Sequence, residues 1–150
     1  MIALDTNILI YAVGGSDPKQ RDEIAKALIR RLPPVGAIVP VQVIAEFLNA
    51  CRRKKILSMA KALVRADEFL MAFTSPCSLT DDLLDAGALS ARIQLAYFDA
   101  LIITVAARAG ATLLLSEDMQ DGLEVEGLRV VNPFVAANAV WINGVIDQAS

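Results

Sequence analysis

Four acidic residues occupy positions at which a carboxylate could do chemistry. Asp5 directly follows the apolar run Ile2–Leu4, and Asp118 lies just past a second apolar run at 112–115. Glu46 and Asp99 each interrupt an apolar helical pattern. A lone carboxylate in such a setting is costly to bury unless it is paired, hydrogen-bonded or bound to a cation. The pattern therefore predicts that the four carboxylates act together.

The sequence contains no histidine. This excludes Ser-His-Asp and Cys-His catalysis and any zinc site built on imidazole. Carboxylates that converge without a basic partner repel one another and raise one another's pKa. A divalent cation relieves that repulsion, and Asp and Glu oxygens without His or Cys are the ligand set suited to Mg²⁺ or Mn²⁺. Such ions commonly serve phosphodiester cleavage, in which they polarise a phosphate oxygen and activate water.

Three of these acids also have a simpler interpretation. Asp99 is placed where it could be the N-cap of a helix, and Asp5 could cap the helix that follows it by accepting from backbone amides. Glu46 could be a helix residue that faces solvent. The sequence leaves these alternatives open.

The elements that must position the acids are short apolar strands alternating with helices. Strands are predicted at 2–4, 37–39, 112–115 and 128–131. Helices are predicted at 8–13, at 43–51, from Thr80 to 93 and at 98–110. Two further helices are predicted to begin at an Asp17 cap, with Pro18 at the first helical position, and at Ser58. In the helix after Ser58, Ala62, Leu63, Ala66, Phe69 and Leu70 are expected to face inward. This alternation predicts a single α/β domain with a parallel sheet covered on both faces. Ligands collect at the carboxyl ends of such strands, so Asp5 and Asp118 are expected to meet there.

Composition limits the cellular setting and the partners. No apolar run approaches the roughly 20 residues that span a membrane, and Asp5 and Asn7 interrupt the apolar N-terminus, which argues against a secretory signal. With two cysteines in 150 residues, we expect a cytoplasmic protein with reduced thiols and no membrane association. The net charge of −3 argues weakly against a broad nucleic-acid-binding surface. It leaves room for a local basic patch at Arg52, Arg53, Lys54 and Lys55.

Four acid-bearing segments resemble those of the PIN-domain nucleases, of the kind found as the toxin in VapC-type toxin–antitoxin pairs. The segments are Leu4-Asp5-Thr6-Asn7-Ile8-Leu9, Val43-Ile44-Ala45-Glu46-Phe47, Phe98-Asp99-Ala100-Leu101-Ile102 and Leu114-Leu115-Ser116-Glu117-Asp118-Met119. Val130-Val131-Asn132-Pro133-Phe134 also fits the family's last strand. The segments follow the family's order over about residues 1–134. The tail, 135–150, lies outside the resemblance, and its placement is not predicted.

The resemblance implies a three-layer α/β/α sandwich with a five-stranded parallel sheet and an acidic pocket that binds one or two Mg²⁺ or Mn²⁺ ions. The acidic quartet matches Asp5, Glu46, Asp99 and Asp118, and Ser116 matches a hydroxyl residue that supports the site. Thr6 and Asn7 follow the first Asp as the family pattern expects, while Glu117 either orients water or faces solvent. Arg52, Arg53, Lys54 and Lys55 either contact RNA phosphates or form a solvated helix end. The implied partners are RNA, a small antitoxin protein and a second copy of the chain in a homodimer.

The predicted reaction is hydrolysis of RNA phosphodiester bonds. Asp5, Asp99 and Asp118 would hold the metal, water would attack phosphorus in line, and Glu46 would help to ligate or accept a proton. One alternative is a phosphatase or phosphotransferase with Asp5 as the nucleophile. Asn7 stands where that chemistry usually has a second acid, and no lysine follows Leu95. The other alternative is a non-catalytic interaction module whose acids are structural caps.

Overall fold

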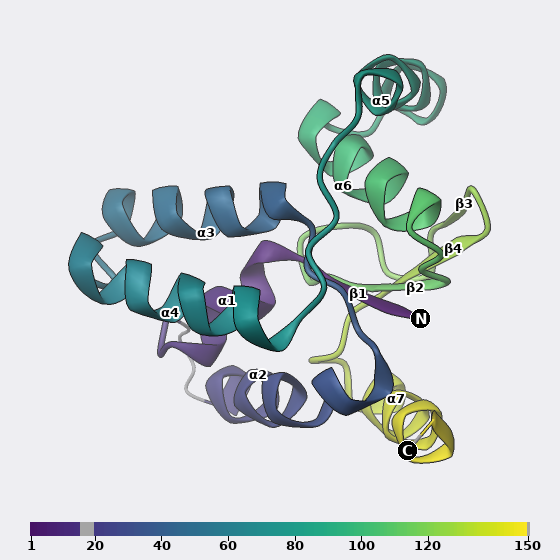
Figure 1. Cartoon of the computed structure of the whole chain (residues 1–150). Coiled ribbons are helices and arrows are strands. Elements are labelled where there is room, and N and C mark those ends of the chain that lie inside the picture. The colour runs from purple at the N-terminus through teal and green to yellow at the C-terminus, as the bar shows by residue number, and fades with distance from the viewer. Residues whose placement is uncertain (16–19, 150) are drawn as a thin grey trace.

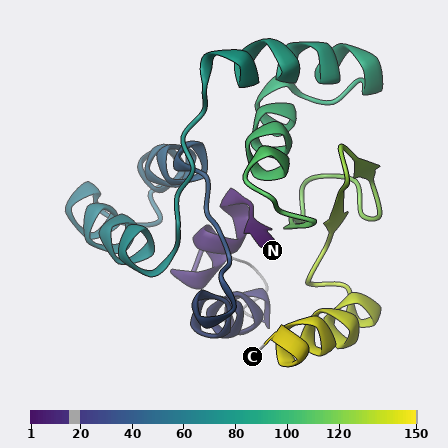
Figure 2. The same ribbon diagram turned by 45° about the vertical axis from the view of Figure 1, so that its right-hand side comes forward.

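The molecule is a small sheet with helices on both sides, shown by a computed structural model that describes residues 1–15 and 20–149. In Figure 1 and Figure 2, α5 (Thr80–Ile93) and α6 (Tyr97–Arg108) lie on one side of the sheet, and α2 (Gln20–Arg31) and α7 (Ala136–Ala149) lie on the other. The predicted α/β class with a covered sheet is confirmed. The predicted helix cap at Asp17 and Pro18 lies outside the described residues.

The sheet has the strand order β1-β2-β4-β3. Strands β1 (Ile2–Leu4), β2 (Leu113–Leu115) and β4 (Leu128–Val131) are parallel, with Leu4 opposite Leu115 and Leu115 opposite Val131. Strand β3 (Glu124–Val125) is antiparallel to β4. The expectation of five parallel strands is therefore corrected to a mixed sheet of four in the described residues.

Two local features account for this difference. The predicted strand at 37–39 is reduced to single parallel bridges from Ile38 to Ala3 and to Thr74. Gly36, with a left-handed φ of 76°, and the helix-initiating Pro40 leave no room for a longer strand. The unpredicted β3 exists because Glu126 and Gly127 both have positive φ, at 54° and 76°. Two consecutive residues with positive φ form the tight turn that joins antiparallel strands.

The remaining helices lie close to their predicted positions. They are α1 (Thr6–Ala12), α3 (Val41–Arg53) and α4 (Met59–Ala72), together with a short 3₁₀ turn at Pro33–Val35. The predicted start at Ser58 is confirmed, because its hydroxyl accepts from the Lys61 amide at 3.4 Å. Helix α5 begins at Thr80 as predicted, and its N-cap is Leu79, whose amide donates to Asp82 at 2.7 Å.

One prediction about packing is wrong. Leu63 and Leu70 on α4 are 52% and 46% exposed, although they were expected to face inward. Helix α4 packs mainly against α3, so it buries only the narrow stripe of Ala62, Ala66 and Phe69. The wider apolar face of α4 stays at the surface.

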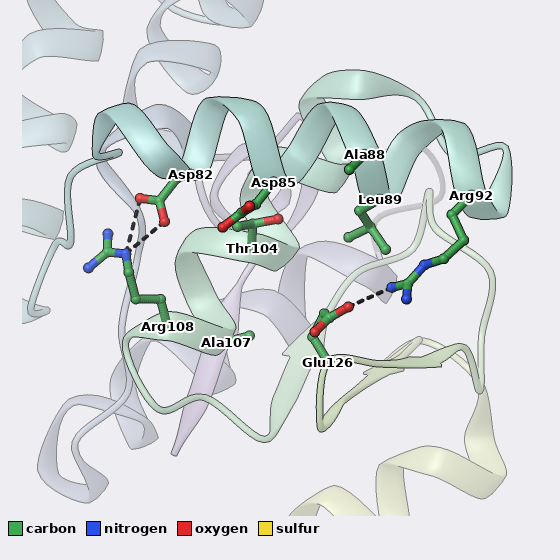
Figure 3. A pocket seen from close by; sticks show the side chains of 9 residues that line it. All are labelled: Asp82, Asp85, Ala88, Leu89, Arg92, Thr104, Ala107, Arg108 and Glu126. Atoms are coloured by element: carbon green, nitrogen blue, oxygen red, sulfur yellow. Dashed lines mark hydrogen bonds and ion pairs between the residues drawn. The ribbon is translucent and has the colours of Figure 1, made fainter.

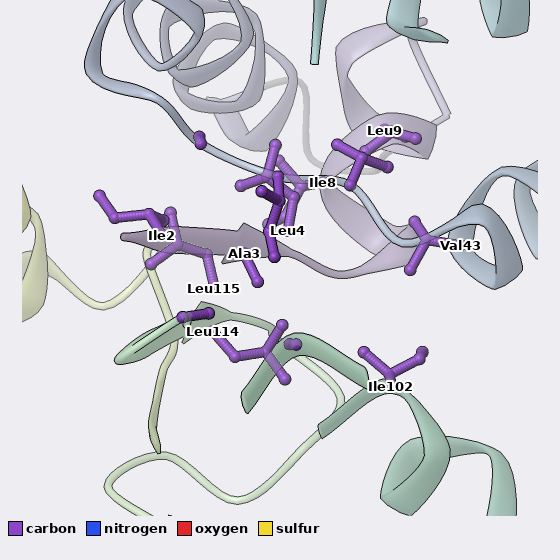
Figure 4. Packing of buried hydrophobic residues seen from close by; sticks show 14 of the residues in the cluster. Ile2, Ala3, Leu4, Ile8, Leu9, Val43, Ile102, Leu114 and Leu115 are labelled. Atoms are coloured by element: carbon purple, nitrogen blue, oxygen red, sulfur yellow. The ribbon is translucent and has the colours of Figure 1, made fainter. Parts of the chain in front are cut away.

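The core is centred on strands β1 and β2. Every residue of β1 and β2 is buried, which explains why these strands are continuous apolar runs rather than alternating ones. Figure 4 shows Ile2 and Leu4 of β1 packed with Leu115 of β2, with Leu9, Val43 and Ile102 contributed by the surrounding helices.

The C-terminal segment, which the sequence left unplaced, forms α7 against the rest of the chain. Ile142 and Ile146 are each 2% exposed and belong to the main core. The Arg31 guanidinium on α2 donates to Asp147 at 2.8 Å and to Asn143 at 2.5 Å. These contacts attach α7 to α2.

Among the described residues, no single helix is long and apolar enough to cross a membrane. Helices α5 and α6 reach that length only when taken together, and they are bent by 120° at the break between them.

Candidate active site

The four predicted acids line one hollow of about 240 Å³. Asp5 follows β1 and begins α1, Glu46 lies in the middle of α3, Asp99 lies in the first turn of α6, and Asp118 lies in the loop after β2. Four separate elements thus deliver one carboxylate each. The hollow is also lined by Thr6, Asn7, Ile10, Asn49, Ala50, Arg53 and Lys54.

Asp5 is the most buried of these acids, at 5% exposure. Its carboxylate accepts from the Thr6 amide at 2.6 Å, the Ser116 hydroxyl at 2.6 Å and the Asn7 side-chain amide at 3.2 Å. Burial raises the pKa of Asp5 to about 6, and the charges of Asp99 and Asp118 add to the rise, while hydrogen bonds from Ser116 and Thr6 oppose it. The cap interpretation of Asp5 is therefore confirmed, and the same carboxylate also faces the other acids.

Glu46 is half-buried and held by two neutral donors. The Thr6 hydroxyl donates to one carboxylate oxygen at 3.1 Å, and the Gln42 side-chain amide donates to the other at 2.6 Å. The same amide donates to the Phe98 carbonyl at 3.0 Å. Gln42 thereby ties α3 to the start of α6, next to Asp99. Sequence reasoning missed Gln42, although its position one turn before Glu46 on the same helix was a usable signal.

Asp99 is not a helix cap, because α6 begins at Tyr97 and its N-cap is Ala96. Burial raises the pKa of Asp99 above its ordinary value, and the charges of Glu46 and Asp118 raise it further. The raised pKa therefore reflects burial first and the repulsion of the neighbouring carboxylates second. Asp118 is exposed, and no described residue donates a hydrogen bond to its carboxylate.

The residues around Asp118 are fixed to α1. The Ser116 hydroxyl accepts from the Met119 amide at 3.2 Å while it donates to Asp5. The Glu117 amide donates to the Asn7 side-chain carbonyl at 3.3 Å. Ser116 and Asn7 therefore each connect Asp5 to the loop that carries Asp118.

The Glu117 side chain does not line the acidic hollow, and it does not face solvent freely. Its carboxylate accepts a hydrogen bond from the Tyr11 hydroxyl and forms an ion pair with Arg21 at 2.8 Å. Neither partner was identified from the sequence.

The predicted basic run divides into two pairs. Arg53 and Lys54 line the hollow with the four acids, whereas Arg52 and Lys55 do not line it. Arg52 instead donates to Asn49 at 3.4 Å. The difference follows from the end of α3, which turns successive side chains to different sides.

The donor set suits Mg²⁺ or Mn²⁺ in chemistry and charge. Four carboxylates line the hollow, and the charges of neighbouring acids add to the burial that raises the pKa of Asp5 and Asp99, a repulsion that a bound cation would relieve. Within the described residues, no three of these side chains are grouped closely enough, as they stand, to hold a metal ion. The carboxylates would therefore have to draw together around the ion.

A larger hollow of about 610 Å³ lies between α5, α6 and the turn after β3 (Figure 3). Arg108 donates to both oxygens of Asp82 at 2.8 and 3.0 Å, and Arg92 pairs with Glu126 at 2.5 Å. Because most of its charged groups are paired with one another, this hollow lacks the uncompensated charge of the acidic site.

Comparisons with known proteins identify the family and the fold. The PIN domain family model matches residues 2–120. A solved structure of a toxin-antitoxin complex from Klebsiella pneumoniae is similar in fold, with a TM-score of 0.66 and 22% identity over 89% of this chain and 98% of that one. No curated protein matches the chain. Since the family model covers most of the sequence, the chain belongs to the PIN domain family, whose members are generally nucleases.

Proposed function

We propose that this chain is a metal-dependent endoribonuclease and the toxin of a toxin–antitoxin pair. The observation that carries the proposal is the convergence of Asp5, Glu46, Asp99 and Asp118, from four separate elements, on one hollow. Membership of a family of nucleases supports the reaction class. The fold likeness to a chain of a toxin-antitoxin complex supports the biological setting.

Asp5, Asp99 and Asp118 would hold Mg²⁺ or Mn²⁺. When bound, such an ion polarises a phosphate oxygen and stabilises the leaving oxyanion. Hydrogen bonds from Thr6, Asn7 and Ser116 fix the orientation of the Asp5 carboxylate. Its oxygens would therefore already be oriented when the ion binds. Cation binding would also favour the ionised form of Asp5 over the protonated form that burial favours.

Glu46 would assist by completing the ligand set or by accepting a proton from the attacking water. Its two oxygens are held by Thr6 and Gln42, both uncharged donors. Uncharged partners orient the carboxylate without neutralising it, which leaves its negative charge for the reaction.

Arg53 and Lys54 would contact the phosphates of RNA. They lie in the same hollow as the acids, so they can attract the backbone to the site in a chain whose net charge is −3. The attraction is local and would weaken with added salt.

The proposed partners are a small antitoxin protein and a second copy of the chain. Apolar side chains exposed on α4 and α5 leave surface that such partners could cover; they are Met59, Leu63, Val64, Leu70, Met71, Leu83 and Leu84. Cys51 and Cys77 are both unpaired, which fits the proposed cytoplasmic location.

The proposal is tested by digestion of a mixed RNA pool with Mg²⁺ or Mn²⁺, beside an Asp118→Asn control and a matched DNA pool. We expect metal-dependent fragments from RNA with the wild-type protein alone. Equal cleavage by Asp118→Asn, or a covalent phosphoenzyme at Asp5, would contradict the proposal.

A further inference from the structure

The loop that carries Asp118 is held in place through the neighbours of Asp118. Asp118 is exposed, and no hydrogen bond from the described residues holds its carboxylate. Its orientation must therefore come from the residues on either side. Ser116 and Met119 are tied together through the Ser116 hydroxyl at 3.2 Å, which leaves Glu117 as the remaining neighbour to be fixed.

Glu117 is anchored at both its backbone and its side chain. Its amide donates to Asn7 at 3.3 Å, and its carboxylate, only 15% exposed, pairs with Arg21 at 2.8 Å and accepts from the Tyr11 hydroxyl. Burial raises the pKa of Tyr11 to about 12, and the bond to Glu117 adds to the rise. The hydroxyl therefore remains a donor at neutral pH.

The three side chains are themselves held in place. The Tyr11 ring packs edge-on against Phe134, with ring centroids 5.3 Å apart. The Arg21 guanidinium lies 6.0 Å from the centroid of the Tyr11 ring, within the range of a cation–π contact. Arg21 thus touches both members of the Tyr11–Glu117 pair, and it brings α2 into contact with the loop after β2.

We infer that Glu117, held by Tyr11 and Arg21, is a positioning residue that fixes the loop so that Asp118 faces the acidic hollow. Arg21 also pairs with the Glu117 carboxylate, which does not line the hollow formed by the other four acids. The inference rests on the proposed function, because it concerns the metal affinity of that same site. Groups that orient metal ligands typically change metal affinity or activity by about 10- to 100-fold when they are removed.

The variants are Tyr11→Phe, Arg21→Gln and Glu117→Gln. Tyr11→Phe removes one hydroxyl and leaves the ring against Phe134, so it preserves the fold. Arg92→Gln is the matched control, since it breaks an Arg–Glu pair at Glu126, outside the acidic hollow. Arg21→Lys restores the positive charge and should recover part of any loss.

Three measurements are made on each protein. Calorimetric titration gives the Mn²⁺ affinity, and cleavage of a short RNA gives kcat and KM separately. Amide hydrogen exchange of Glu117 and Met119, whose amides donate to Asn7 and Ser116, is followed in metal-free protein. We expect the three variants to bind Mn²⁺ about 10-fold more weakly, with lower kcat, unchanged KM and faster exchange at both amides. The control should match the wild type.

The inference is overturned if Glu117→Gln and Tyr11→Phe keep the wild-type Mn²⁺ affinity and exchange rates. It is also overturned if Arg21→Gln raises only KM, in a salt-dependent way, because Arg21 would then be an RNA contact. A wild-type protein that neither binds Mn²⁺ nor cleaves RNA would overturn the proposed function, and this inference with it. The wild-type result and the variant results therefore test the two claims separately.

Discussion

The Ser116 hydroxyl lies 2.6 Å from the Asp5 carboxylate, although the two residues are 111 positions apart. Each is the first residue after a strand, and the preceding residues, Leu4 and Leu115, are directly opposite in register. Because neighbouring parallel strands end at the same edge of the sheet, the pairing of β1 with β2 brings the two side chains together. The register of two short apolar strands thus sets the position of the most buried acid.

Asp5→Asn should abolish RNA cleavage while the protein stays folded. The substitution removes the negative charge needed to hold a divalent cation, but it keeps the size of a side chain buried among three donors. Cleavage rates and circular dichroism of the two proteins check this directly. Cleavage at the wild-type rate would exclude Asp5 from the catalytic site.

The stability of the metal-free protein should fall as pH rises from about 4 to about 6. The pKa of Asp5 is raised from 3.8 to about 6 in the fold, so the folded state binds the proton more tightly than the unfolded chain. The stabilisation is complete below pH 3.8 and is lost as pH passes 6, with a magnitude of up to about 3 kcal/mol. The raised pKa of Asp99 acts in the same direction.

Denaturant unfolding at several pH values measures this effect. Subtracting the curve of Asp5→Asn isolates Asp5 from the other titrating groups. Saturating Mn²⁺ should reverse the trend, because the cation binds the ionised form. If the difference in unfolding free energy between the wild type and Asp5→Asn does not vary over this pH range, ionisation of Asp5 does not destabilise the folded protein.

Replacing Arg53 and Lys54 together with alanine should raise KM for RNA by about 10-fold or more and reduce the salt dependence of binding. Both side chains lie in the hollow with the acids, and each lost phosphate contact lowers the slope of affinity against salt by about one. The control is the Arg52→Ala, Lys55→Ala double variant, which removes the same charge from residues outside the hollow. Equal losses in the two variants would mean that only net charge matters.

Asp82→Ala should lower the free energy of unfolding by about 2 kcal/mol. The buried carboxylate caps the Leu79 amide at 2.7 Å and accepts twice from Arg108, so one substitution detaches the start of α5 from the end of α6. Asp85→Ala, an exposed position on the same helix, should change the free energy by less than about 0.5 kcal/mol. Thermal or chemical unfolding distinguishes the two.

Helix α7 should stabilise the nuclease domain that the sequence predicts at residues 1–134. Ile146→Ala should cost about 2–5 kcal/mol because Ile146 is 2% exposed, whereas Val140→Ala, at a residue that is 77% exposed, should cost little. A chain ending at Phe134 should unfold at a lower temperature than the full chain. Equal melting temperatures would show that the domain is independent of α7.

The sequence predicts the parts of this fold that depend on local pattern. Continuous apolar runs marked β1 and β2, and a mostly apolar run interrupted by Arg129 marked β4. A carboxylate after β1 and another after β2 marked the edge where ligands collect. Only the structure decided the alternatives for Asp99, since α6 begins at Tyr97, two residues before it. Asp5 has both of its predicted roles, because it caps α1 and lines the acidic hollow.

Features that depend on contacts between distant segments were not predictable. Nothing near Tyr11 or Arg21 in the sequence indicates that both meet Glu117. The residues of α7 lack a clean helical apolar stripe and include Gly144, so that helix depends on its docking against α2. The loss of the strand at 37–39 came from backbone restrictions at Gly36 and Pro40, which an apolar pattern does not report.

The pairing of β1 with β2 also sets when the protein can become active during its synthesis. The first strand leaves the ribosome early, but its parallel partner begins at Leu113 and the last acid is Asp118. Contacts so distant in sequence form slowly and only after the intervening chain exists. A nascent chain shorter than about three-quarters of the full length therefore carries Asp5, Glu46 and Asp99 without the strand that seats them. Under the proposed function, a nascent chain with this topology cannot assemble the site that would cleave RNA until Asp118 has been synthesised.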